Sequence, residues 1–113
     1  MSTQDRPPID LPAPVAAFFA PDGDAEVTAR CFSEDAVVLD ERRTHQGRAA
    51  IARWRREAAA QYSFTSEPLA IQTSGDEVTV RSRVRGDFPG SPIELRYRFT
   101  LAGDEIARLE IAP

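Results

Sequence analysis

The chain is organised around the stretch FSEDAVVLDERRTHQGRAAIARWRREAAAQY, which runs from Phe32 to Tyr62. Residues 36–39 are a short apolar run rich in valine, which is typical of a buried strand. Residues 40–45 are all polar and predict a turn, which leads into a helix expected over residues 47–60. A carboxylate that ends a buried strand and faces a helix suits chemistry as well as it suits a solvated strand end.

The expected helix has one apolar side. Ile51, Trp54 and Ala58 are spaced three and four residues apart, which predicts a stripe that packs on the core. Trp54 is interpreted as a core residue, as a residue that faces the end of the preceding strand, or as both. A solvated face is expected for the charged residues around the stripe, which are Arg48, Arg53, Arg55, Arg56 and Glu57.

Toward the N-terminus the chain is rich in proline and then helical. Residues 1–14 contain four prolines and predict an extended arm, which precedes a single domain over residues 15–113. Residues 15–20 are apolar and predict a short helix that Pro21 ends, and a second short helix is expected over residues 25–31. Both helices need tertiary packing to persist.

Toward the C-terminus the pattern changes to strands. Residues 62–73 predict a weaker strand, in which Pro68 fits an edge position or a bulge. Residues 77–87 and 93–101 alternate between apolar and polar side chains, and residues 105–112 predict a last strand. Helices first and a meander of antiparallel strands last is the pattern of an α+β fold.

The polar side of the alternating strands is strongly basic. It carries Arg81, Arg83, Arg85, Arg96 and Arg98. Positive side chains on neighbouring strands repel unless acidic groups or water intervene. Two interpretations remain open: a solvated outer face, or a dimer interface where these arginines pair with carboxylates of a second subunit.

Composition limits the function classes. The 113 residues fit one domain, and a net charge of −4 argues against a nucleic-acid partner. Cys31 is the only cysteine, which excludes an intrachain disulfide and favours the cytoplasm. No apolar run reaches the ~20 residues that span a bilayer, and residues 1–14 lack the pattern of a secretory signal. One histidine, one cysteine and scattered glycines predict no metal and no nucleotide cofactor.

The order of these segments resembles the nuclear transport factor two-like superfamily, in its branch of SnoaL-like polyketide cyclases and ketosteroid isomerases. The resemblance covers residues 15–111 and rests on these markers: Gly23, Asp24, Phe32, Asp35, Ala36, Gly47, Ala50, Ile51, Gly103 and Ile106. It implies a cone, in which about three N-terminal helices pack on a strongly bent, mainly antiparallel sheet. It also implies an apolar pocket at the open end of the cone and a homodimer.

The resemblance carries over one functional position. Asp40 falls where ketosteroid isomerase keeps the aspartate that abstracts a proton next to a carbonyl group. The positions of the two groups that stabilise the enolate in that enzyme fall at Ala16 and near Leu95, with Glu94 beside it. Without those donors steroid isomerisation by that route is not expected. SnoaL-type cyclases need only a base, an acidic C–H group and a shaped apolar pocket.

Further residues are candidates for the same site. His45 follows Asp40 across the polar run and can act as acid, base or hydrogen-bond donor, or can be an ordinary turn residue. Arg43 can hold an anionic or carbonyl oxygen, or can lie on the surface. The expected substrate-binding walls, each with core packing as its alternative, are Trp54, Tyr97 and Phe18.

These observations predict a cytoplasmic homodimer that binds an apolar, carbonyl-bearing small molecule. If it is an enzyme, it catalyses proton transfer or cyclisation with Asp40 as base and His45 or Arg43 as helper, without a metal or nucleotide. The alternatives are a hydrophobic-ligand carrier of the same fold and a protein-interaction module whose cone is filled by its own side chains.

Overall fold

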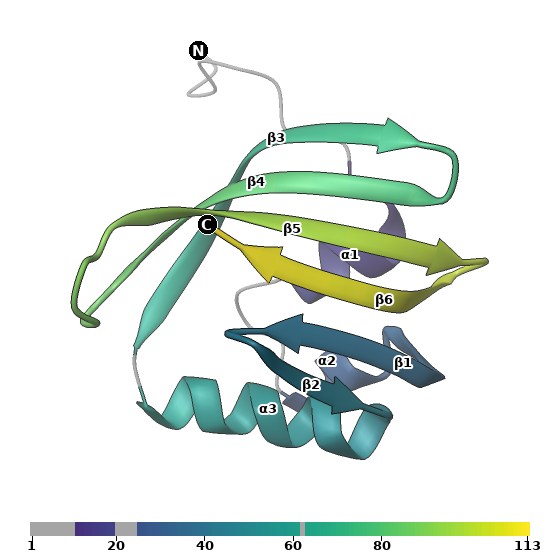
Figure 1. Ribbon diagram of the computed structural model, residues 1–113, viewed down its shortest axis with the longest axis horizontal. Helices are drawn as coiled ribbons and strands as arrows, with labels where there is room; N and C mark the ends of the chain where they lie inside the picture. Colours follow the sequence, from purple (N-terminus) through teal and green to yellow (C-terminus); the bar gives the residue numbers. More distant parts are fainter. Residues whose placement is uncertain (1–10, 20–24, 62) are drawn as a thin grey trace, which may run out of the picture.

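The computed structural model describes residues 11–19, 25–61 and 63–113 (Figure 1). Its elements in chain order are α1 (Ala13–Phe18), α2 (Ala25–Ala29), β1 (Phe32–Asp40), β2 (Arg43–Gln46), α3 (Arg48–Gln61), β3 (Phe64–Ser74), β4 (Glu77–Gly86), β5 (Ile93–Ala102) and β6 (Glu105–Ala112). The strands form one curved, unclosed sheet in the order β2-β1-β6-β5-β4-β3, and the helices pack on one side of it. The predicted α+β fold, with three helices on a bent and mainly antiparallel sheet, is therefore confirmed.

The start of the chain differs from the prediction at one boundary. Helix α1 begins at Ala13, inside the stretch expected to be an extended arm, because Pro14 lies in the first turn, where a missing N–H group costs nothing. The rest of that arm up to residue 10, the expected stop at Pro21 and the marker pair at residues 23–24 lie outside the described residues.

The polar run after β1 is a hairpin, so its prediction as a plain turn was wrong. Strand β2 pairs antiparallel with β1, with His45 opposite Val38 and Arg43 opposite Asp40. Only Glu41 and Arg42 form the turn, with φ angles of 52° and 66°, as a two-residue hairpin of primed type requires. Strand β2 lies at the edge of the sheet, where a strand does not need the apolar alternation that identifies an inner one.

Strand β1 is longer than predicted and lies beside the last strand. It runs parallel to β6, with Phe32 next to Ile106 and Leu39 next to Glu110, and the register shifts between Phe32 and Val37. The sheet is therefore mixed, with one parallel pair in an otherwise antiparallel arrangement.

The opposite edge of the sheet agrees with the sequence. Strand β3 is the last strand of the order, and its register with β4 shifts between Pro68 and Ala70. The predicted edge position and bulge at Pro68 are both confirmed.

The core lies between the helices and the inner side of the sheet. On β4 the predicted inner residues are buried, namely Val78, Val80, Ser82 and Val84. Phe18 of α1 is 2% exposed, and its ring centroid lies 5.5 Å from that of Phe99 and 6.1 Å from that of Phe32. One aromatic side chain from a short helix thus joins several elements at the centre of the molecule.

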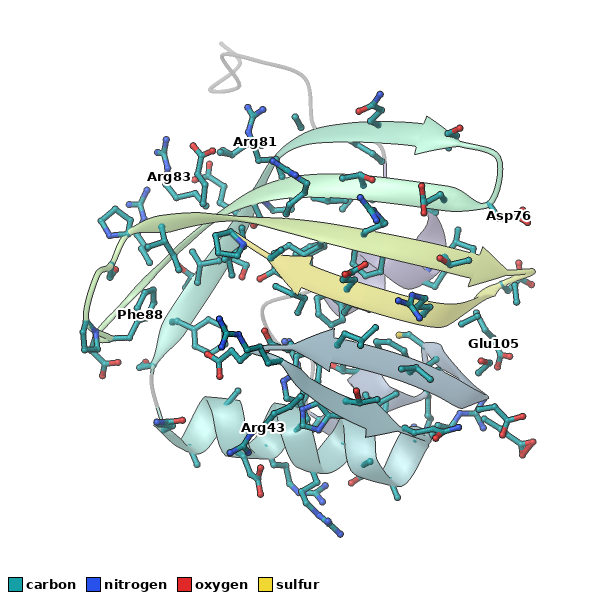
Figure 2. The ribbon with its side chains drawn as sticks, in the orientation of Figure 1. Arg43, Asp76, Arg81, Arg83, Phe88 and Glu105 are labelled. Carbon is teal, nitrogen blue, oxygen red and sulfur yellow. The ribbon has the colours of Figure 1, made fainter. Side chains whose placement is uncertain are left out.

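The outer side of the sheet is basic and paired. Arg81 contacts Glu94 at 3.4 Å and Arg98 contacts Glu110 at 3.6 Å, while Arg85 approaches Glu67 at 4.0 Å. Figure 2 shows Arg81 among the side chains that project from β4. Carboxylates on neighbouring strands thus relieve the repulsion expected between the arginines, which favours the solvated face over an interface that needs a second subunit.

Candidate functional site

Asp40 ends strand β1 on the inner side of the sheet, two residues after the buried Val38. Its carboxylate oxygen Oδ2 accepts a hydrogen bond of 3.1 Å from the indole Nε1 of Trp54 on α3. The apolar stripe of α3 faces β1, and it therefore brings the indole to the strand end. The sequence-predicted pair of a strand-end carboxylate and a helical tryptophan is a direct contact.

The surroundings of Asp40 change its pKa. Partial burial raises the pKa of the Asp40 carboxyl above 3.8, since the charged form loses hydration. The Trp54 hydrogen bond opposes this rise in pKa, the negative charge of Glu41 adds to it, and His45 and a hydrogen bond from the Glu41 backbone oppose it. A carboxylate with a raised pKa that stays partly accessible has the properties of a general base.

His45 lies near this pair without bonding to the carboxylate. Its side chain is half-buried on β2, and its ring centroid lies 5.8 Å from that of Trp54 at an interplanar angle of 30°. Among the described residues, Asp40 and His45 are therefore both neighbours of the Trp54 indole, and no hydrogen bond joins them directly.

Arg43 lies across the hairpin from Asp40, with its side chain exposed to solvent. The structure gives it no ion pair with any residue in the described ranges. Its role as a ligand-binding residue stays a prediction.

Arg55 was expected on the solvated face of α3, and this interpretation was wrong. Its side chain is half-buried, with the guanidinium carbon 4.7 Å from the ring centroid of Phe18 and 5.9 Å from that of Trp54. Burial lowers the pKa of the Arg55 guanidinium, and the neighbouring Tyr97 opposes that change. Arg55 follows Ile51 by four residues, so the helical spacing that placed Trp54 on the inner face could have placed Arg55 there as well.

Tyr97 lies within electrostatic range of both Arg55 and Asp40. It is 5% exposed on β5, and burial raises the pKa of its phenol, against the effect of a hydrogen bond with Ser66. Arg55 and Asp40 are both near enough to change the Tyr97 pKa, the first downward and the second upward. Ser66 was not singled out from the sequence, because a serine on an irregular edge strand gives no periodic signal.

Phe18 is the buried apolar residue that contacts both Trp54 and Tyr97. Its ring stacks at 6.4 Å on Trp54 and meets Tyr97 edge to face at 6.0 Å. With Phe18 and Tyr97 both buried, much of their surface serves the core, and Trp54 retains more access to solvent. The six residues proposed from sequence are thus not equivalent: five lie close together, and Arg43, which is directly opposite Asp40 on the hairpin, has an exposed side chain.

The enolate-stabilising groups of ketosteroid isomerase have no counterpart at the positions expected for them. Ala16 is exposed on α1, and Leu95 on β5 packs against the core. A further feature of the inner side is the hydroxyl of Ser82, which is buried without a hydrogen-bond partner among the described residues. Within those residues, no group of three or more histidine, cysteine, aspartate or glutamate side chains is arranged to hold a metal ion.

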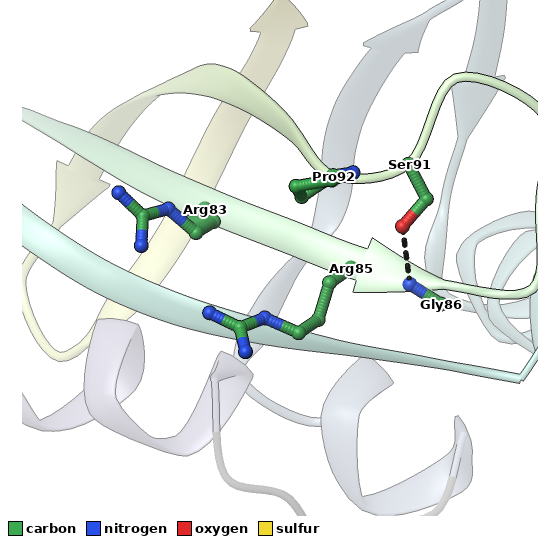
Figure 3. Close-up of a pocket in the computed structure, with 5 residues that line it drawn as sticks. All are labelled: Arg83, Arg85, Gly86, Ser91 and Pro92. Atoms are coloured by element: carbon green, nitrogen blue, oxygen red, sulfur yellow. Dashed lines mark hydrogen bonds between the residues drawn. The ribbon is translucent and has the colours of Figure 1, made fainter.

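A separate hollow of about 530 Å³ lies on the outer side of the sheet, where β4 leads into β5 (Figure 3). Its lining includes Arg83 and Arg85, and the Oγ of Ser91 accepts a hydrogen bond of 2.8 Å from the backbone N–H of Gly86. This hollow is open, and its arginines lie on the far side of the sheet from Asp40.

Comparison with known proteins places the chain in a family. The sequence model of the SnoaL-like domain matches residues 13–109. A solved structure from Sinorhizobium meliloti, described as a candidate polyketide cyclase, is 44% identical, with a TM-score of 0.86 over 90% of this chain and 95% of that one. A search of curated proteins finds no match.

More distant solved structures share the fold. A protein from Catenulispora acidiphila with a ketosteroid isomerase-like fold, in complex with trimethylamine, is 20% identical, with a TM-score of 0.82 over 92% of this chain and 87% of that one. An epoxide hydrolase/cyclase-like enzyme with a role in pyran ring formation in salinomycin is 22% identical, with a TM-score of 0.74 over 88% of this chain and 86% of that one. In the part of the chain that the structure describes, no helix is long and apolar enough to cross a membrane. The chain therefore belongs to the SnoaL-like family and has the α+β fold shared with the nuclear transport factor two-like and ketosteroid isomerase-like proteins.

Proposed function

We propose that this protein binds an apolar carbonyl compound on the inner side of its sheet and catalyses proton transfer or cyclisation, with Asp40 as the general base. The observation that carries the proposal is the contact between Asp40 and Trp54, because it holds a carboxylate of raised pKa beside an aromatic surface. The resemblance to a candidate polyketide cyclase at 44% identity supports the same class of reaction.

The chemistry is a reversible proton transfer at carbon. The Asp40 carboxylate accepts a proton from the carbon next to the carbonyl group, and the electron pair of the C–H bond moves into the enolate. The protonated Asp40 then returns the proton to carbon. Alternatively, the enolate carbon attacks a second carbonyl carbon of the same molecule and closes a ring, the π electrons of that carbonyl group move to its oxygen, and this oxygen takes the proton from Asp40. The Trp54 N–H group orients the carboxylate, because it donates a hydrogen bond to Oδ2.

Deuterium exchange tests the base assignment without knowledge of the natural substrate. We expect the protein to accelerate deuterium incorporation next to the carbonyl group of 2-tetralone in D₂O, followed by NMR. Asp40→Asn should reduce the rate to that of buffer, since the amide cannot accept the proton while it still accepts the Trp54 hydrogen bond. Asp35→Asn is the matched control, because Asp35 is an exposed carboxylate of the same strand. Equal exchange by the wild type and Asp40→Asn would remove Asp40 as the base.

A non-catalytic carrier is the second candidate function. It is favoured by Ala16 and Leu95, which stand where the related isomerase keeps its enolate-stabilising groups. A carrier would show ligand-dependent thermal stabilisation by aromatic ketones, with no deuterium exchange in any variant. A ligand present at 100 times its dissociation constant stabilises a folded protein by about 2.7 kcal/mol. The roles of His45 and Arg43, the homodimer and the cytoplasmic location stay predictions.

A further inference from the structure

We infer that Arg55, together with the hydroxyl of Tyr97, binds an anionic oxygen of the ligand. The natural ligand is then a carbonyl compound that carries a carboxylate or forms an enolate readily, rather than a neutral apolar molecule. This inference rests on the proposed function, because it places the ligand beside the same Trp54 and Asp40.

The first support is the setting of the Arg55 charge. A charged group that leaves water is normally compensated by an opposite charge or by hydrogen bonds. Among the described residues, Arg55 has no ion pair and no hydrogen bond, and its neighbours are the ring faces of Phe18 and Trp54. Attraction between a guanidinium and an aromatic ring compensates part of the lost hydration. The planar N–H donors of the guanidinium remain available for an oxygen anion.

The contrast with other arginines of the chain makes this setting specific. Arg48 binds Glu105 at 2.8 Å and also donates to the backbone oxygen of Phe32, and Arg56 binds Glu26 at 2.6 Å. These two side chains lie on the same helix as Arg55, and each has a carboxylate partner. Arg48 and Arg55 are both half-buried, but Arg48 has a carboxylate partner, whereas Arg55 faces aromatic rings.

The second support is the order of groups on the inner surface. The Tyr97 phenol lies within electrostatic reach of both Arg55 and Asp40, and Trp54 contacts both of these residues. A carbonyl compound placed on this aromatic surface can present its C–H group to Asp40 and its oxygen to Tyr97 and Arg55. As the proton leaves carbon, negative charge collects on that oxygen, where a cation and a hydroxyl donor stabilise it. Arg55 and Tyr97 would then supply what Ala16 and Leu95 do not.

Three probes with related two-ring bodies test the inference. These are 2-naphthoate, a carboxylate; 2-hydroxy-1,4-naphthoquinone, an enol that ionises in water; and 2-acetonaphthone, a neutral ketone. We expect the wild type to bind at least one anionic probe at neutral pH more tightly than the ketone, by calorimetry. Preference for the quinone identifies an enolate site, and preference for the naphthoate identifies a carboxylate site. Equal affinity for all three probes, or no binding of either anion, would overturn the inference.

The variants separate charge from packing. Arg55→Met should weaken the preferred anion tenfold or more and change the affinity for 2-acetonaphthone by less than twofold. Arg55→Lys keeps the charge and should retain part of the anion binding. Arg53→Met is the matched control, because Arg53 is an exposed arginine on the same helix, and it should change neither affinity. Equal losses for anion and ketone in Arg55→Met, in a protein that circular dichroism shows to be folded, would mean that Arg55 only shapes the core.

Asp40→Asn keeps this inference distinguishable from the proposed function. It should abolish deuterium exchange and leave the anion affinity equal or higher, because a negative neighbour has been removed. If Asp40→Asn leaves exchange unchanged while Arg55→Met loses the anion, the base assignment fails and the anion site stands. If exchange needs Asp40 but anion binding is indifferent to Arg55, the anion site fails and the base assignment stands.

Discussion

Arginines lie on both sides of the sheet, and the groups that surround their charge differ between the two sides. On the outer side Arg81 and Arg98 are more than half exposed and pair with carboxylates of neighbouring strands. On the inner side Arg55 lies against Phe18 and Trp54 without such a partner among the described residues. The same residue type thus pairs with carboxylates on one side and packs against aromatic rings on the other. The difference is set by the surroundings of each arginine.

The largest change in the free energy of unfolding should come from Phe18, the buried aromatic residue on the inner side of the sheet. Phe18→Ala removes a buried ring that contacts four aromatic side chains on three other elements, and it should lower the free energy of unfolding by about 3 to 5 kcal/mol. Urea unfolding at equilibrium measures this change. Ile93→Ala is the control from an exposed site, since Ile93 is 39% exposed, and it should cost less than about 1 kcal/mol. Similar costs at both positions would contradict the view that Phe18 organises the inner side.

The next effect concerns the inner arginine and has the opposite sign. Arg55→Met replaces a half-buried cation with an apolar side chain of similar length, and it should raise the free energy of unfolding by about 1 to 2 kcal/mol. Thermal and urea unfolding of the ligand-free proteins measure this gain. A clear loss of stability in Arg55→Met would show that the guanidinium is already satisfied in the folded protein, which would weaken the case for an anionic ligand.

The inner carboxylate should show a smaller gain that depends on pH. The folded pKa of Asp40 lies above 3.8, so the folded protein holds this proton more tightly than the unfolded chain does. The stability contributed by protonation is fully present below pH 3.8 and is lost as the pH rises through the folded pKa. Asp40→Asn should therefore be more stable than the wild type at pH 7.

That advantage should disappear as the pH is lowered toward 3.8, because the wild-type carboxyl is then neutral as well. Unfolding curves at a series of pH values measure it, and Asp35→Asn provides the reference for an exposed carboxylate on the same strand. An advantage of Asp40→Asn that stays constant with pH would have to come from packing rather than from charge.

The smallest effect should come from the outer side. Arg98→Ala removes one member of an exposed ion pair with Glu110, and it should change the free energy of unfolding by less than about 0.5 kcal/mol. Added salt should reduce even this difference. A loss above 1 kcal/mol that depends on protein concentration would instead indicate that this side of the sheet joins two copies of the chain.

The sequence predicted the features that repeat along an element. Strand β4 has a side chain of fixed polarity at every second residue, and its buried residues were identified for that reason. Pro68 indicated that β3 lies at an edge, because proline has no backbone N–H group to donate to a neighbouring strand. Strand β2 was missed because its residues are all polar. A strand at the sheet edge can form its backbone hydrogen bonds without the apolar alternation that identifies an inner strand.

The site was predictable in part. Asp40 and Trp54 came from the resemblance and from helical spacing, yet their hydrogen bond depends on how α3 lies against the end of β1, which no local pattern encodes. Arg55 was assigned to solvent because residue type was given more weight than its spacing from Ile51. Ser66 on β3 forms a hydrogen bond with Tyr97 on β5, and no local pattern of the sequence indicates this contact between two strands that are not neighbours.

The place of β6 between β1 and β5 has a consequence for synthesis on the ribosome. While the chain emerges, β3, β4 and β5 can pair as successive hairpins, but β1 and β2 cannot join the same sheet by strand pairing until Glu105–Ala112 has been made. Asp40 and Tyr97 therefore lie on two parts of the sheet that are not paired with each other until β6 inserts between them. A nascent chain that stops before β6 exposes the unpaired edges of β1 and β5, which favours aggregation, and a ligand of the proposed site would stabilise only the finished protein.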